Sequence, residues 1–137
     1  MEQRNDFILR EIQKLSLFLK KLIQEVTGIN SNDVEIGINQ TSEALKAQFD
    51  LSIREIIELN NNELIVKISS LHETHIEKLA ELINEIVKKL SQDKKEYGFD
   101  RKELASKAIV LIEYLDNKSD TFSIARMNLK NVLQHLI

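Results

Sequence analysis

Apolar residues recur at helical spacing along nearly the whole chain, and the clearest run lies near its start. The run consists of Ile8, Ile12, Leu15, Leu19, Leu22 and Val26, separated by alternating steps of four and three residues. This spacing draws one stripe along an α-helix, which we predict to run from about Asp6 to Val26. Asn5 or Asp6 is expected to cap its start, and Gly28 to end it in the left-handed conformation. A stripe of this length must be buried against another surface.

Two further helices are predicted before residue 60. The first begins near Asn32 or Asp33, where Asn32 and Glu35 have the form of a capping box. Its inner face carries Val34, Ile38, Thr41, Leu45 and Phe49. Gly37 either weakens its first turn or allows a close helix contact. Asp50 or Ser52 then caps a short helix, whose apolar residues are Ile53, Ile56, Ile57 and Leu59.

Asn60, Asn61 and Asn62 form the clearest break in the first half, because asparagine favours turns and helix starts. The pattern predicts that helix resumes at Glu63 or Leu64 and continues to about Asp93. Its inner positions are Leu64, Ile68, Leu71, Ile76, Leu79, Ile83, Ile86 and Leu90. An interruption near Ser69-Ser70 is the alternative, since Ser70 to Glu73 also has the form of a helix start.

A charged connection, Lys94 to Gly98, precedes two more predicted helices. Asp100 with Glu103 has capping-box form and opens a helix from Arg101 to Leu115. That helix buries Leu104, Ala108, Leu111, Ile112 and Leu115. After a polar turn from Asp116 to Asp120, Ser123 caps the last helix. Its inward residues are predicted to be Ile124, Met127, Val132, Leu133 and Leu136.

Composition supports this helical interpretation. The 137 residues include no proline, no cysteine and only three glycines, so few residues interrupt a helix. The same scarcity removes most residues that build phosphate-binding loops or sharp catalytic turns. We therefore predict an all-α fold, an irregular bundle of six or seven helices in a single domain over residues 1–137, with antiparallel hairpins at its C-terminal end.

Charge and composition also narrow the classes of partner and compartment. The net charge is −3, and aromatic residues make up 5% with no tryptophan, which argues against nucleic acid as a partner. The absence of cysteine excludes disulfides and thiol catalysis, and fits a reducing cytoplasm. Acidic residues near the start do not fit a signal peptide, and the longest apolar run, Ala108 to Ile112, is too short to cross a bilayer.

His72 and His75 form the most conspicuous chemical motif. Histidines three residues apart share a helix face and could ligate a metal. The zinc-protease pattern, however, needs its second histidine one position later, where Ile76 stands. No third ligand is evident from the sequence, so we expect the pair to lie on a solvated face and not to bind metal.

A row of carboxylates follows the same predicted helix at Glu73, Glu77, Glu81 and Glu85. A di-iron bundle would need Glu-x-x-His pairs on two helices, and no histidine here follows a glutamate at that spacing. We therefore expect this row also to be a solvated face. No nucleophile–base pair is indicated elsewhere, and we predict no catalytic, cofactor-binding or metal-binding residues.

Basic residues flank the apolar stripe of the first helix at Arg10, Lys14, Lys20 and Lys21. Such a helix could rest on an anionic membrane surface. Glu11 and Glu25 dilute the charge, and the regular spacing of the stripe is more typical of helix–helix packing. A membrane partner is therefore the less favoured alternative.

Two sequence resemblances accompany these patterns. The opening from Asp6 to Ile12, followed by Leu15, resembles an uncharacterised bacterial family of helical proteins, a domain of unknown function. The C-terminal stretch is similar to the end of such proteins in Tyr114-Leu115-Asp116, Thr121-Phe122-Ser123 and Arg126-Met127. The resemblance implies no activity, cofactor or catalytic residue.

The second resemblance is to tetratricopeptide-like helical hairpins. Ala105, Ala108 and Tyr114 match the small-residue positions and the aromatic of such a repeat. The chain departs from that family in lacking a proline at the repeat end, a preceding Leu-Gly pair and a second copy 34 residues away. A generic antiparallel helix pair explains the same residues.

The leading functional prediction is a non-enzymatic interaction or scaffold protein that acts through helix surfaces, with a protein partner or as a homodimer. The predicted interaction residues are Ile8, Ile12, Leu15, Leu19 and Leu22. The alternative is an enzyme that binds a small ligand or a metal in a site between helices.

Overall fold

The computed structural model describes residues 2–90, 99–119 and 121–137, and these residues form seven α-helices without a β-strand. The helices are α1 (Glu2–Thr27), α2 (Val34–Phe49), α3 (Ile53–Glu58), α4 (Asn61–Ile68), α5 (Glu73–Lys89), α6 (Arg101–Lys118) and α7 (Ile124–Gln134). The predicted all-α bundle of six or seven helices is therefore confirmed.

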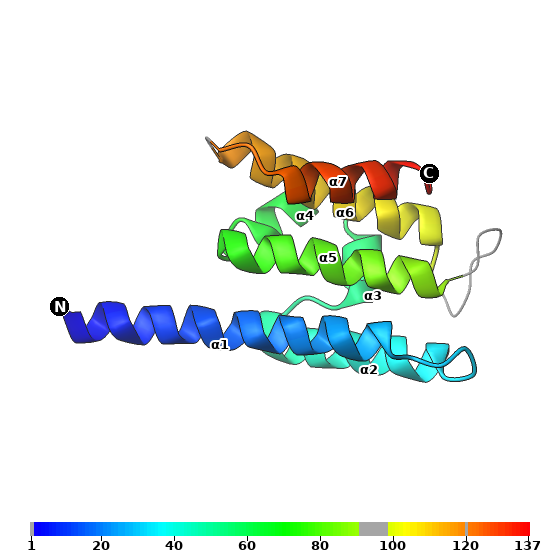
Figure 1. The fold of residues 1–137 in the computed structure, drawn as a ribbon, viewed down its shortest axis with the longest axis horizontal. Coiled ribbons are helices and arrows are strands. Elements are labelled where there is room, and N and C mark those ends of the chain that lie inside the picture. Colours follow the sequence, from blue (N-terminus) through cyan, green and yellow to red (C-terminus); the bar gives the residue numbers. More distant parts are fainter. Residues whose placement is uncertain (1, 91–98, 120) are drawn as a thin grey trace.

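The helices form successive antiparallel hairpins around α5. In Figure 1, α1 and α2 lie side by side at one edge of the molecule, and α5, α6 and α7 follow in order towards the opposite edge. α5 packs against α1, α6 and α7, while α3 and α4 contact α6. The long helices α1 and α5 run in the same direction, so α1 lies along α5 for part of its length (Figure 1).

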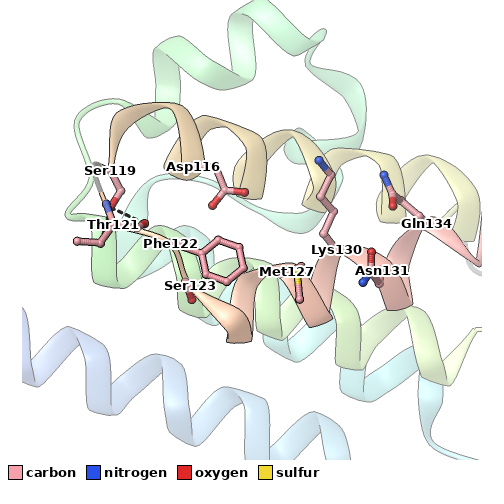
Figure 2. Close-up of a pocket in the computed structure, with 9 residues that line it drawn as sticks. All are labelled: Asp116, Ser119, Thr121, Phe122, Ser123, Met127, Lys130, Asn131 and Gln134. Atoms are coloured by element: carbon pink, nitrogen blue, oxygen red, sulfur yellow. Dashed lines mark hydrogen bonds between the residues drawn. The ribbon is translucent and has the colours of Figure 1, made fainter.

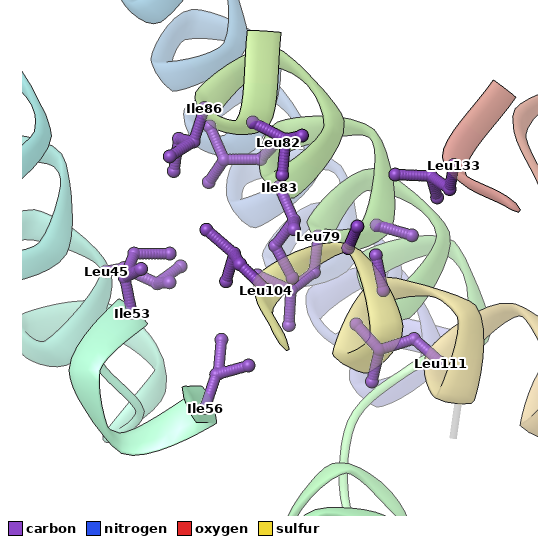
Figure 3. Packing of buried hydrophobic residues seen from close by; sticks show 14 of the residues in the cluster. Leu45, Ile53, Ile56, Leu79, Leu82, Ile83, Ile86, Leu104, Leu111 and Leu133 are labelled. Carbon is purple, nitrogen blue, oxygen red and sulfur yellow. The ribbon is translucent and has the colours of Figure 1, made fainter. Parts of the chain in front are cut away.

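One continuous hydrophobic core joins these helices. Leu45, Ile53 and Ile56 face the central helices from α2 and α3, and Leu133 reaches the core from α7 (Figure 3). Ala80 on α5 and Ala105 and Ala108 on α6 are fully buried. Small side chains at these positions allow two helices to approach closely, which fits the extensive contact between α5 and α6.

Several predicted helix starts are confirmed by their hydrogen bonds. Ser52 and Glu55 form a reciprocal capping box at the start of α3. Asn60 and Glu63 form a second one, so α4 begins two residues earlier than the apolar pattern suggested. The hydroxyl of Ser123 accepts the amide hydrogen of Arg126, as expected for the cap of α7.

The interruption that the sequence left open separates α4 from α5. α4 ends at Ile68, and α5 begins at Glu73 with His72, not Ser70, as its cap. The prediction that helix continues to Asp93, and the connection from Lys94 to Gly98, lie outside the described residues.

Other predicted helix ends were wrong. α1 begins at Glu2, so Asn5 and Asp6 lie inside the helix and cap nothing. Gly28 does not take the left-handed conformation; Asp50 does so at the end of α2, with φ of 55°. The carboxylate of Asp50 forms exposed ion pairs with Lys46 and Lys67, at 3.1 Å each.

Two further local predictions need correction. Asp33 precedes α2 without a side-chain cap, so the box expected from Asn32 and Glu35 does not form. Gly37 allows close contact, but with a connecting residue: a Cβ there would lie 2.5 Å from Cδ1 of Ile29.

The inner face of α7 also differs from the prediction. Ile124, Met127 and Val132 are exposed, while Leu133 is buried. Arg126 faces inward instead, because its guanidinium bonds to Asp116 at 2.8 Å and to the carbonyl oxygen of Thr121 at 3.2 Å. α6 continues to Lys118, beyond the predicted end at Leu115.

Candidate functional site

The apolar stripe of α1 divides into a buried half and an exposed half. Leu19 and Leu22, with exposed fractions of 1% and 4%, belong to the core, as does Val26. Ile12 and Leu15 are half-buried, and Ile8 is 47% exposed. Of the five predicted interaction residues, only Ile8, Ile12 and Leu15 therefore have surface that a partner could reach.

Two polar side chains of α5 hold the buried half of α1. Nε2 of His75 lies 2.9 Å from the carbonyl oxygen of Ile12. At the other end, Nζ of Lys89 donates to the carbonyl oxygens of Thr27, at 3.0 Å, and Ile29, at 3.1 Å. A cation at this end also complements the negative C-terminal pole of α1.

On the N-terminal side of Ile12, α1 extends past the point where α5 begins. Every residue from 4 to 11 is exposed, and we call these residues the projecting segment. Figure 1 shows this start of α1 extending beyond the helices that pack against its later turns. Phe7 and Leu9, 62% and 56% exposed, lie on either side of Ile8. Large apolar side chains that gather on an exposed surface are one mark of a binding site.

The charges around the projecting segment are mixed. Arg4 and Arg10 alternate with Asp6 and Glu11, and all four are exposed. The basic residues Lys14, Lys20 and Lys21 are exposed as well. Among the described residues, no helix is long and apolar enough to span a bilayer.

The histidine pair differs from its predicted solvated face. His75 is buried, with its ring in edge contact with Phe49 at 5.6 Å between centroids. Because a carbonyl oxygen only accepts, Nε2 of His75 must carry the hydrogen of its bond to Ile12. His72 is exposed, and its Nδ1 accepts the amide hydrogen of Thr74. Both histidines thus have structural contacts.

The carboxylate row is also less solvated than predicted. Glu73 is exposed, but Glu77, Glu81 and Glu85 are half-buried. Burial raises the pKa of the Glu81 carboxyl, an effect that Lys78 opposes and Glu77 reinforces. Within the described parts of the chain, no three histidine, aspartate or glutamate residues are placed to hold a metal ion.

Polar side chains line a surface cavity of about 450 Å³ where α6 meets α7 (Figure 2). Asp116 on its wall pairs with Arg126 at 2.8 Å, and Lys130 pairs with Glu113 at 3.5 Å. The charged groups are thus already engaged within the protein. The hydroxyl groups of Ser119 and Thr121 bond to each other at 2.9 Å.

A small space between α1, α2 and α5 is lined by Leu19, Leu45, Phe49, Leu71, His75 and Leu79. It has no room for even a water molecule. Sites for small-molecule ligands usually measure about 300–1,000 Å³. Its size and apolar lining are those of a packing defect.

Comparison with known proteins gives no relative: no family model, no curated protein and no solved structure matches this chain. The two resemblances drawn from the sequence therefore stay predictions, and the candidate site rests on the geometry of α1.

Proposed function

We propose that this chain is a non-enzymatic protein–protein interaction or scaffold module that binds through the start of α1. One observation carries the proposal: the start of α1 extends past the core as a helix and presents Phe7, Ile8 and Leu9 to solvent. Exposed apolar side chains are costly to maintain on a surface and are covered favourably by a partner.

The partner is a protein, either a different chain or a second copy of this one. The mixed charge of the projecting segment gives no attraction to nucleic acid and little to an anionic membrane. The reducing cytoplasm is the compartment that the cysteine-free sequence fits. The alternative of an enzyme with a site between helices has less support. The space near His75 has no room for even a water molecule, and the charged groups that line the cavity between α6 and α7 are paired within the protein.

The proposal is tested by purifying the full chain from its native host together with bound proteins. Ile8→Asp should abolish co-purification of the specific partner, since a carboxylate cannot be buried cheaply in an apolar contact. Val66→Asp is the matched control, because Val66 is also an exposed aliphatic residue but lies on α4. Light scattering on the same proteins separates a second copy from a different partner. The proposal would be overturned if the parent chain, Ile8→Asp and Val66→Asp co-purified with the same proteins in equal amounts. It would also be overturned if the chain carried a bound metal or small molecule and no protein partner.

A further inference from the structure

We draw no further inference here: the strongest candidate, the apolar surface patch of Phe7, Ile8 and Leu9 at the start of α1, belongs to the surface already proposed to bind a partner, and nothing in the structure shows what covers it.

Discussion

His75 and Lys89 show how single polar residues set the position of a long helix. Each reaches from α5 to a carbonyl oxygen of α1 or of the connection that follows it. A buried donor that finds its acceptor contributes modestly, but the same donor left unpaired is costly. These contacts therefore favour one alignment of α1 along α5 over alignments shifted by a turn.

Alanine substitutions of His75 and His72 compare the stability contributed by a buried contact with that contributed by an exposed helix cap. We expect His75→Ala to lower the free energy of unfolding by about 1–3 kcal/mol, because it removes the bond to Ile12 and the ring contact with Phe49. His72→Ala should cost about 1 kcal/mol or less, the usual loss for a helix cap. Chemical denaturation of both variants measures the difference. A larger loss for His72→Ala would contradict the assigned contacts.

Glu81 gives a prediction about pH. Its folded-state pKa is raised by burial, so the folded protein holds this proton more tightly than the unfolded chain does. Stability from this group is fully present below the unfolded pKa and is lost as pH rises through the folded pKa. Glu81→Gln should therefore stabilise the protein at pH 7, by less than about 1 kcal/mol because water still screens the half-buried carboxylate.

Thermal melts of Glu81→Gln and the parent chain between pH 4 and 7 measure this effect. The gain should shrink as pH falls, since the parent carboxyl is then neutral too. Glu73→Gln is the control, because Glu73 occupies the same row but is exposed. A gain that is equal at every pH, or equal for the two variants, would contradict the assignment to burial.

Helix α1 serves two purposes along one continuous apolar stripe. Its later turns belong to the core, and its first turns extend past the point where α5 begins. The first turns continue the helical hydrogen bonding of the packed later turns, so the exposed side chains are presented on a preformed helix. A preordered helix loses less conformational entropy on binding than a flexible segment would.

Alanine substitutions along the stripe should lower the free energy of unfolding by amounts that decrease towards the start of α1. Leu19→Ala should cost about 2–5 kcal/mol, the usual loss for a filled core position. Leu15→Ala should cost less, and Ile8→Ala should change stability by no more than about 0.5 kcal/mol, as at other surface positions. Chemical denaturation of the three variants checks the order. A loss at Ile8 equal to that at Leu19 would show that the start of α1 is packed.

For the whole molecule, α5 is the centre of the fold. It contacts α1 on one side and α6 and α7 on the other, and most of its residues are buried. The buried hydrophobic residues of its last turns include Leu82, Ile83, Ile86 and Val87. On the other side of the bundle, Lys107 of α6 donates a hydrogen bond to the carbonyl oxygen of Leu59, at the end of α3. This bond connects α6 to α3. Stability should therefore decrease from α5 and α6 outwards to the start of α1.

Amide hydrogen exchange on the intact protein should reveal this decrease. We expect the slowest exchange in the buried turns of α5 and α6, where opening disrupts the core. Exchange should be fastest, among helical amides, in the projecting segment, where opening breaks hydrogen bonds but little packing. Protection at residues 4–11 equal to that of α5 would indicate that the start of α1 is already covered, for example by a second copy.

The sequence by itself determined the helical class, most helix positions and much of the core. Periodic apolar positions and the lack of proline depend only on the local geometry of a helix, so they are readable from neighbouring residues. The capping box of Ser52 and Glu55 was predictable for the same reason, since both partners lie within four residues. The inner faces of α2 and α5 were likewise evident from spacing alone.

Only the tertiary structure decided which part of each apolar face is covered. The stripe of α1 has the same spacing at Ile8 as at Leu22, yet one is exposed and the other buried, because α5 starts too late to reach Ile8. Similarly, Leu133 is buried on the inner face of α7 as expected, but Arg126 is buried there while Ile124 and Met127 are exposed, since its partner Asp116 lies on another helix. His75 is buried for a comparable reason: its acceptor is 63 residues away in sequence. Local patterns specify which side chains are suited to burial, whereas the lengths and relative offsets of packed helices determine which of them have a neighbour.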